Sequence, residues 1–354
     1  MPKVIADSQY AAWLADRVEL EPLEASLTRL GFGLEALARR GGRLGGFVRG
    51  VFMAYRGRNA AVLVVCDHQP GAATVLFCEA WLRRRRRIVL IELLRGPRPR
   101  RAWARALYGA WSALVRGPAL RRAVAVAHVL TREEIERYGK LYGLDASRIA
   151  FVPWPWRQFR EPQALEPRAS MQVGEASVLS SGRAYCDWAT LLAAARGREW
   201  QLTVLCSTSD ATEVIRLSAG EDVVVHAELP LAEHGQMLER AGVYVISLRE
   251  DWVSAGQVRL MHAVQAGVPV VATDGPQLRD YCIDGETALL VACGDHRAMA
   301  QAVERVLTDP ELAEALRQGA WRHSARWVRD DYLDAIAELV KRAASGSVRV
   351  SSRP

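Results

Sequence analysis

Hydrophobic runs alternate with amphipathic segments along most of the chain. In the first half, uninterrupted runs rich in Val, Ile and Leu are separated by segments whose apolar residues recur every three to four positions. Such runs predict strands buried on both faces, and the longer period predicts helices that cover them. We therefore expect a helical N-terminal region followed by a parallel sheet. The expected strands are 60–66, 87–94, 123–130 and 149–154, and the expected helices are 74–84, 101–115 and 132–143.

A break in this rhythm divides the chain. The segment 153–176 is rich in proline and charge and has no periodic apolar pattern, which predicts a linker. The alternation of strands and helices then starts again. The expected strands are 177–182, 201–206, 223–229, 243–248, 268–273 and 288–293. The expected helices are 187–196, 211–219, 232–241, one that opens at Ser254 and a long one from about Asp295.

The pattern predicts an α/β protein with two Rossmann-like, doubly wound parallel sheets. A chain of 354 residues is long enough for two domains that each bury a core. Ligands of such sheets bind at the carboxyl ends of the strands, so two domains facing a cleft would hold their ligands between them. We expect an N-terminal domain over 1–157, a linker over 158–175, a C-terminal domain over 176–332, and a helix with a disordered tail over 333–354.

Composition is that of a soluble globular protein, with 50% hydrophobic and 25% charged residues. No apolar run approaches the roughly 18 residues that span a bilayer, and the N-terminus lacks the apolar core of a signal peptide. The six cysteines are scattered without a CxxC pair, which favours reduced thiols. We therefore expect a cytoplasmic protein.

Charge is distributed unevenly along the chain, whose net charge is +7. Residues 1–160 contain 28 Lys and Arg against 13 Asp and Glu, whereas residues 161–354 contain 19 against 27. This asymmetry predicts that the first half faces an anionic partner.

The segment SSGRAYCDW (180–188) joins an expected strand to an expected helix. Gly182 permits a tight turn and the close approach of a ligand. Arg183 offers a forked, permanently charged donor to a phosphate. The alternative is an ordinary strand-to-helix loop with a solvated arginine.

The segment SAGQVRLMHAV (254–264) opens a helix directly after the expected strand 243–248. The first N–H groups of a helix are unpaired and carry partial positive charge, so they attract anions. The residues expected to hold a diphosphate there are Ser254, Ala255, Gly256 and Gln257. On the same helix, His262 is either a polar surface residue or part of the site.

These segments resemble the C-terminal donor-binding domain of retaining GT-B glycosyltransferases, the family 4-like, group 1 enzymes. That family commonly shows a Gly-Arg turn, a Ser-x-x-Glu … Glu-Ala-x-x-x-Gly-x-Pro-Val block, and an Asp-Gly-x-x-Gly-x-Leu-Val turn before a Gly-Asp helix start. The resemblance covers roughly 176–330, and the first half matches only in its alternating rhythm. The corresponding segments are SGR (181–183), SLRE (247–250), HAVQAGVPVVAT (262–273) and DGETALLVACGD (284–295).

The resemblance implies a GT-B fold and an EC 2.4 glycosyltransferase. Such an enzyme moves a sugar from a nucleotide-diphosphate sugar to a hydroxyl acceptor with retention, in polysaccharide, glycolipid or natural-product synthesis. The donor is a co-substrate, and no other cofactor is expected. No DxD sequence stands on a suitable loop, which agrees with a metal-independent site where N–H groups and Arg side chains stabilise the departing diphosphate.

The two-glutamate motif departs from the family pattern. His262 stands at the second glutamate, which binds the nucleotide ribose in the family. Glu250 takes the place of the first glutamate but lies three or four residues early. The family's Lys after the Gly-Arg turn is also missing, since Asp187 and Trp188 occupy that region. Arg183 and Glu250 are the catalytic candidates on this side, and the other expected phosphate ligands are the helix start, Arg249 and Arg259.

The first half is expected to bind the acceptor. The strand 60–66 ends in CDHQPG, which puts Asp67 and His68 at its carboxyl end. They either orient or deprotonate an acceptor hydroxyl or cap the following helix. We take His68 as the catalytic candidate, and Asp67 and Glu92 as acceptor-side residues.

The most basic segment is 83–122, with thirteen Arg, one acidic residue, and interleaved Trp, Tyr and Leu. It fits a peripheral surface on the inner face of an anionic membrane, where a lipid-linked acceptor would lie. A solvated face of a chain that uses Arg heavily explains it equally well. Aromatic-basic RNA-recognition signatures are absent, which argues against a nucleic-acid partner.

Two alternatives to an active glycosyltransferase stay open at this stage. The missing glutamate pair and Lys also fit a catalytically silent homologue that acts as a binding subunit. Two Rossmann-like domains also fit a sugar-nucleotide epimerase.

Overall fold

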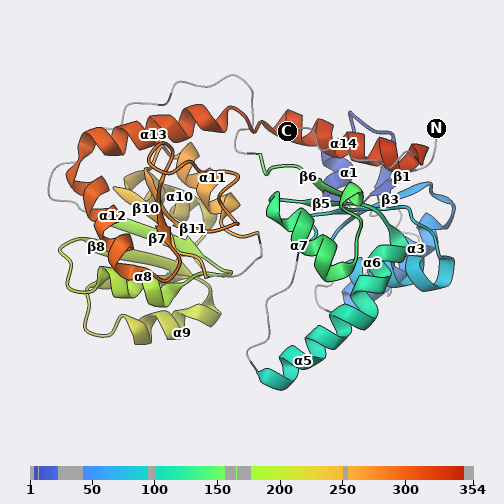
Figure 1. Cartoon of the computed structure of the whole chain (residues 1–354), viewed down its shortest axis with the longest axis horizontal. Helices are drawn as coiled ribbons and strands as arrows, with labels where there is room; N and C mark the ends of the chain where they lie inside the picture. The colour runs from blue at the N-terminus through green and yellow to red at the C-terminus, as the bar shows by residue number, and fades with distance from the viewer. Residues whose placement is uncertain are drawn as a thin grey trace. The chain divides into compact units, whose positions relative to one another are not determined.

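The chain is described by a computed structural model that forms two compact units (Figure 1). Unit 1 comprises Met1–Pro153 and Asp331–Pro354, and unit 2 comprises Trp154–Asp330. The described residues are 4–6, 8–22, 43–94, 101–155, 165, 177–249 and 254–346. The linker predicted over 158–175 therefore lies outside the described residues apart from residue 165, as does the tail after 346.

Unit 1 is built on a parallel six-stranded sheet with the order β2-β1-β3-β4-β5-β6. The four predicted strands are confirmed as β3 (Val62–Cys66), β4 (Ile88–Ile91), β5 (Val124–Val129) and β6 (Ile149–Phe151). The sequence missed β1 (Val4–Ala6) and β2 (Leu20–Pro22), because three residues are too few to show a period. The N-terminal region that was expected to be helical therefore also contains two strands, and α1 (Ser8–Leu14) lies between them in the sequence.

Helices cover both faces of this sheet because alternate strand residues point to opposite sides. On β3, Leu63 and Val65 belong to one core with α3 (Arg43–Arg56), α4 (Ala72–Phe77), α6 (Gly117–Ala123) and α7 (Glu133–Tyr142). Val62 and Val64 belong to a second core with α1 and α14 (Arg329–Ser345). The sequence set 333–354 apart, but the apolar stripe of α14 packs on unit 1 beside α1.

Two π-helical turns interrupt the helices on the first of these faces. α4 continues as the turn Cys78–Arg83, and α5 (Ala102–Trp111) continues through Ser112–Arg116 into α6. Across the described ranges, every helix is too short or too polar to cross a bilayer.

Unit 2 has a second parallel sheet with the order β12-β11-β10-β7-β8-β9. All six predicted strands are confirmed. They are β7 (Ser177–Gly182), β8 (Gln201–Cys206), β9 (Val223–Ala227), β10 (Val243–Ile246), β11 (Val270–Asp274) and β12 (Leu289–Ala292). The helices between them are α8 (Trp188–Ala195), α9 (Thr208–Leu217), α10 (Leu231–Arg240) and α11 (Gln257–Gln265).

The long helix expected from about Asp295 is instead two helices, α12 (His296–Thr308) and α13 (Pro310–Ser324), and α14 is the helix that was expected separately over 333–354. The break has a local cause: Asp309 accepts a hydrogen bond from the Leu312 N–H at 2.9 Å, and Pro310 takes the first helical position. An Asp cap followed by Pro is a strong start signal for a new helix.

The packing of α13 predicts a difference between two helical glycines of unit 2. A Cβ on Gly319 would overlap the carbonyl oxygen of Glu286, whereas a Cβ on Gly235 of α10 would meet nothing within 4 Å. We expect Gly319→Ala to lower the free energy of unfolding by about 1–3 kcal/mol through overpacking. Gly235→Ala should raise it by about 0.5–1 kcal/mol through helix propensity. Urea unfolding of both variants checks this, and equal effects would show that α13 does not pack on that carbonyl.

Candidate functional site

At the carboxyl end of β7, an arginine lies against a bare backbone. A Cβ on Gly182 would lie 2.5 Å from Arg259 Nη1 and would overlap the Cys186 thiol. Arg259 Nη1 donates to the Ser181 carbonyl oxygen at 2.7 Å. Arg259 Nη2 is buried and has no hydrogen-bond partner among the described residues. A side chain at 182 would therefore displace the Arg259 guanidinium and the Cys186 thiol, and Arg259 keeps one unused donor at the strand end.

Helix α11 begins at Gln257, three residues later than predicted. Its N-cap is Gly256, whose φ of 92° favours glycine, so Ser254 and Ala255 precede the helix instead of opening it. Among the described residues, no side chain caps the first turn. Gln257 is buried and donates its side-chain amide to the Gln277 carbonyl oxygen at 2.8 Å. The group that suits an anion here is the backbone of the first turn.

Helix α8 offers no comparable start. Asp187 accepts hydrogen bonds from the Thr190 N–H at 3.1 Å and from the Thr190 hydroxyl at 2.6 Å. A phosphate at this end would meet a carboxylate that already satisfies the helix. Of these two helix starts, only that of α11 suits a diphosphate.

Of the two catalytic candidates of unit 2, the structure describes Arg183 but not Glu250. Arg183 follows Gly182, is mostly exposed, and pairs with Glu228 at 2.8 Å. Exposed ion pairs are weak, so a phosphate can replace Glu228 as the partner of this arginine. Glu250 and the neighbouring loop 251–253 lie outside the described residues.

A pair of histidines lies next to the end of β7. The rings of His262 and His234 have centroids 6.1 Å apart, and His234 Nε2 lies 2.9 Å from the Ser181 hydroxyl. That hydroxyl also contacts the Tyr244 hydroxyl. Burial lowers the pKa of both histidines, and His262 lowers that of His234 further, which favours neutral rings near pH 7. The sequence missed His234 because a single histidine on an amphipathic helix carries no signal of its own.

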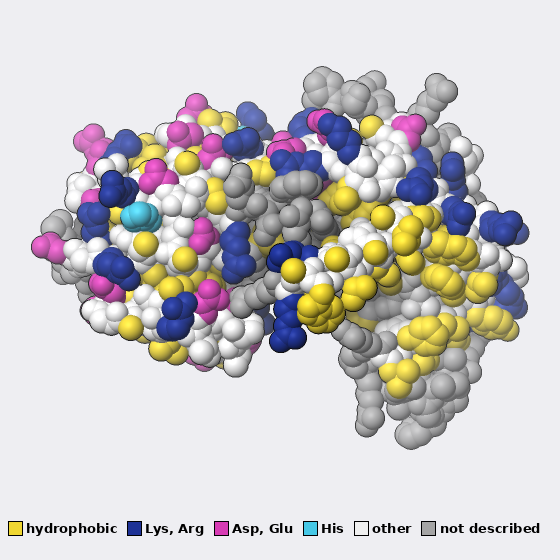
Figure 2. All heavy atoms as spheres, turned by 60° about the horizontal axis from the view of Figure 1, so that its bottom comes forward, with side chains coloured by type: hydrophobic (Ala, Val, Ile, Leu, Met, Phe, Trp, Pro, Cys, Tyr) yellow, Lys and Arg dark blue, Asp and Glu magenta, His cyan; other side chains and the backbone are white. Residues whose placement is uncertain are grey.

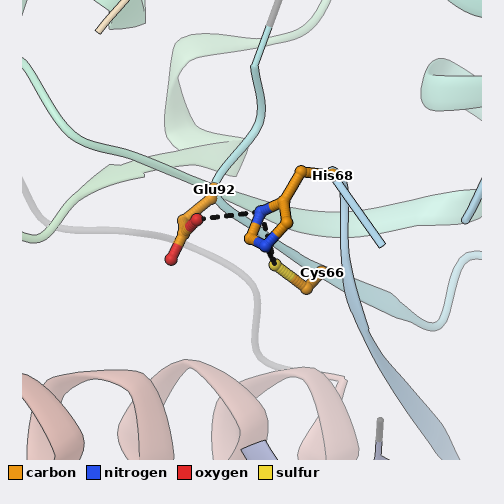
Figure 3. Close-up of side chains that lie close together, drawn as sticks. All are labelled: Cys66, His68 and Glu92. Carbon is orange, nitrogen blue, oxygen red and sulfur yellow. Dashed lines mark hydrogen bonds and ion pairs between the residues drawn. The ribbon is translucent and has the colours of Figure 1, made fainter. Parts of the chain in front are cut away.

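Unit 1 gathers a thiol, an imidazole and a carboxylate where β3 and β4 end (Figure 3). His68 Nδ1 lies 3.2 Å from Cys66 Sγ and 3.1 Å from Glu92 Oε2. Cys66 and Glu92 are buried, whereas the His68 side chain is 45% exposed. The sequence predicted His68 and Glu92 separately, and the structure brings them into contact.

Several buried groups hold the Glu92 carboxylate. The Tyr10 hydroxyl donates to Glu92 Oε1 at 2.8 Å and lies 3.0 Å from the Tyr332 hydroxyl of α14. Burial alone would raise the pKa of Glu92, but the hydrogen bonds and charge of His68, with those of neighbouring groups, hold it below its usual value. Burial raises the pKa of Tyr10, which therefore stays a donor at neutral pH. Glu92 also has a left-handed φ of 54°, a strained backbone for a residue other than glycine.

Asp67 has a structural partner. Its carboxylate is paired with Arg116 at 2.5 Å and accepts from the Leu94 N–H at 2.9 Å. Arg116 also donates to the Leu94 carbonyl oxygen at 2.9 Å. Asp67 thus ties the π-helical turn before α6 to the end of β4, while His68 points at Glu92.

One group among the described residues has the ligand types of a metal site. The ligand atoms of Cys66, His68 and Glu92 all lie within 4.8 Å of one another. Thiolate, imidazole and carboxylate form a set that Zn²⁺ accepts. The same atoms also satisfy one another as a polar chain that ends at a half-exposed imidazole, and this arrangement can exchange a proton with a bound hydroxyl.

Comparison with known proteins shows that solved structures match almost the whole chain, including both units. Residues 186–309 match the family model of the glycosyl transferases group 1. The structure is similar to that of HepE from Anabaena, solved with UDP-glucose, at a TM-score of 0.66 and 12% identity over 96% of this chain and 100% of that one. It is also similar to sucrose-phosphate synthase from Thermosynechococcus elongatus, at a TM-score of 0.66 and 16% identity over 98% and 100%. TarM from S. aureus matches at a TM-score of 0.58 and 13% identity over 82% and 59%.

No curated protein matches the chain. The structural matches confirm the predicted GT-B fold, and the family match confirms the resemblance seen in the sequence of the second half.

His128 generates a pH-dependent prediction for unit 1. Its Nδ1 accepts from the Glu92 N–H at 3.1 Å, so its Nε2 carries the proton and donates to the Val152 carbonyl oxygen at 2.9 Å. Burial lowers its pKa below the ordinary 6.5, so the folded state holds the neutral ring. Below pH 6.5 this histidine is protonated in the unfolded chain but stays neutral in the folded chain. The free energy of unfolding therefore falls by up to about 1.4 kcal/mol for each pH unit of acidification.

We expect His128→Asn to remove this part of the slope between pH 7 and pH 5, since an amide keeps one hydrogen bond and does not titrate. Urea unfolding over this range measures it, with each protein normalised to its own stability at pH 8. Parallel curves for the two proteins would contradict a neutral, buried His128.

Proposed function

We propose that this chain, whose residues 186–309 form a group 1 glycosyltransferase domain in a GT-B fold, transfers a sugar from a nucleotide-diphosphate sugar to a hydroxyl acceptor with retention of anomeric configuration. The observation that carries the proposal is the end of β7 and the start of α11, where an unused guanidinium nitrogen and an uncapped helix start occur together.

The leaving diphosphate is the group that this end of unit 2 suits. Sugar transfer builds negative charge on the phosphate oxygen as the glycosidic bond breaks. N–H groups of the α11 first turn and the Arg259 guanidinium supply fixed positive charge without reorganisation, which lowers the barrier. Arg183 adds a second, more exposed cation. This set of donors supports a site that stabilises the leaving diphosphate without a metal ion.

We propose a uridine diphosphate donor, supported by the UDP and UDP-glucose bound to the similar HepE structures. The neutral rings of His262 and His234 line the same strand end and suit the ribose hydroxyls, in place of the family's second glutamate. A neutral imidazole both donates and accepts a hydrogen bond, as a ribose diol requires.

On unit 1, we propose that His68 and Glu92 bind the acceptor hydroxyl. Glu92 stays ionised, and His68 stands between it and solvent, so the imidazole can take the acceptor proton as the new bond forms. Tyr10 and Tyr332 act as positioning residues because they hold the carboxylate. The basic segment 83–122 favours an acceptor attached to an anionic or membrane-embedded lipid.

A silent, nucleotide-binding homologue is the second candidate. His262 at the position of the second glutamate and Asp187 in the region of the missing Lys favour it. It shares the donor site of the first candidate and differs in transferring nothing.

Arg259 is the donor-site residue to change. We expect Arg259→Gln to weaken UDP binding about 10- to 100-fold, the value of one or two charge-assisted hydrogen bonds to phosphate. Arg183→Gln should have a smaller effect, because its guanidinium is exposed. Arg196→Gln, at an exposed arginine of the same unit, is the matched control. Calorimetric titration measures the affinities, and an Arg259 variant that binds like the control would remove the proposed phosphate site.

Glu92→Gln separates the acceptor side from the donor side. We expect it to leave UDP affinity unchanged and to lower the rate of donor cleavage, with water as acceptor, by about 10²- to 10⁴-fold, the usual contribution of acid–base catalysis. Release of UDP from UDP-glucose gives this rate. Unchanged turnover would show that the cluster of unit 1 is structural, and an inactive wild-type chain that binds UDP would favour the silent homologue.

A further inference from the structure

We propose that unit 1 binds the surface of an anionic lipid bilayer through one face, the apolar–arginine face, formed by α3, α4 with its π-helical turn, and α5 with its π-helical turn. This goes beyond sugar transfer and does not depend on it.

Helix α5 stands out first because none of its ten residues is buried. Trp103 and Leu107 are each 62% exposed, and Trp111 is 38% exposed, at a spacing of four residues. Leu114 on the following turn is 73% exposed. An isolated helix of this length is marginal in water, and helices of globular proteins are stabilised by burying their apolar face. The apolar side of α5 therefore needs a surface to pack against, and the described part of the fold does not provide one.

Helix α3 presents a second apolar stripe. Leu44, Phe47, Val51 and Tyr55 are all at least 43% exposed. Their spacing of three and four residues puts them on one side of the helix. The opposite side of α3 is buried in the core, where Phe52 and Met53 pack on the sheet. The exposed stripe is thus an outer face of a well-anchored helix.

The same side of the sheet carries all of these elements. A Cβ on Gly50 would lie 2.5 Å from the Gly71 carbonyl oxygen, so α3 packs closely against the start of α4. From α4 and its π-helical turn, Phe77 and Leu82 add side chains that are 49% and 74% exposed. α5 leads into α6, which packs in the core shared by α3 and α4. Figure 2 shows hydrophobic side chains gathered over the helices of unit 1.

Charge on this part of the chain has one sign at the surface. The only acidic residues between 43 and 122 are Asp67, Glu79 and Glu92. Their side chains are at most 9% exposed and pair with Arg116, Arg87 and His68. In contrast, the exposed arginines are Arg58, Arg84, Arg85, Arg86, Arg101, Arg105 and Arg122. Arg105 lies on α5, and the other exposed arginines flank the elements of the face. Between 43 and 122, the carboxylates that the structure describes are thus buried, whereas these arginines are exposed.

An anionic bilayer fits this chemistry better than the other occupants. Trp and Leu side chains enter the boundary between headgroups and acyl chains, and arginines at the same level contact lipid phosphates. A second copy of the chain would place arginine against arginine across a two-fold interface. A nucleic acid would leave the apolar stripes of α3 and α5 uncovered.

Vesicle flotation of the full chain, without nucleotide, tests the proposal. The vesicles are pure phosphatidylcholine or phosphatidylcholine with 30 mol% phosphatidylglycerol. We expect at least tenfold stronger binding to the anionic vesicles, and a loss of most of that binding in 0.5 M NaCl, since salt screens the arginines. Equal binding to both vesicles, or no binding to either, would overturn the proposal.

Matched variants separate this face from a general effect of charge or hydrophobicity. Trp103→Asp/Leu107→Asp should weaken binding to anionic vesicles at least tenfold, whereas Ile215→Asp, at a 59% exposed position of α9, should not. Arg85→Gln/Arg86→Gln should weaken it several-fold more than Arg196→Gln/Arg216→Gln in unit 2. All four variants should keep wild-type UDP affinity, so a failure here is distinct from a failure of the donor site.

Size-exclusion chromatography and RNA titration of the same proteins complete the test. The proposal predicts that the Asp variants change neither the oligomeric state nor RNA binding. A wild-type dimer that Trp103→Asp/Leu107→Asp converts to monomers would make the face a contact between copies. Tight RNA binding that these variants abolish would make it a nucleic-acid surface.

Discussion

The hydrogen bond from the Arg259 guanidinium to the Ser181 carbonyl oxygen, made beside Gly182, is the constraint on which the proposed donor site depends. It brings a charge from the first turn of α11 to the end of β7, where a side chain at residue 182 would displace the guanidinium. One guanidinium nitrogen holds the strand end, and another remains for a ligand. Gly256 has a similar role at the helix start. Its backbone is left-handed, and it leaves the first turn of α11 without a capping side chain. Two glycines and one arginine thus produce a site for negative charge.

Unit 1 depends on a different kind of interaction, a buried polar chain drawn from distant parts of the sequence. Tyr10, Glu92 and Tyr332 meet through two hydrogen bonds, although the first and last are 322 positions apart. Burying a carboxylate costs free energy unless the carboxylate is hydrogen-bonded. The hydrogen bonds that Glu92 needs therefore connect α1 and α14 to the end of β4. The return of α14 to unit 1 thereby both completes a core and orients the group that faces His68.

The sequence predicts what depends on local pattern. Ten of the twelve strands in the described part of the chain follow from uninterrupted apolar runs, and the sequence does not predict β1 and β2 because they are too short to show such a run. Asp309 and Pro310 indicate that a new helix begins at α13. The apolar period continues through both helices, and for this reason the break was not predicted. Gly182, Gly256, Arg259 and His262 were found because strand ends and helix starts are visible in the pattern and in the family resemblance. The sequence does not predict which side chains pair with one another, because the partners are far apart in sequence and only packing brings them together. Examples are the pairs Asp67–Arg116, His234–Ser181 and Glu92–Tyr10.

We propose above all that unit 2 binds the diphosphate of a nucleotide sugar. The most direct measurement is the unfolding of the chain in the presence of uridine, guanosine, adenosine and thymidine diphosphates at matched concentrations. We expect UDP at about 100 times its dissociation constant to add about 2.7 kcal/mol to the free energy of unfolding of unit 2, with smaller effects from the other bases. An unfolding transition that no nucleoside diphosphate shifts would contradict it.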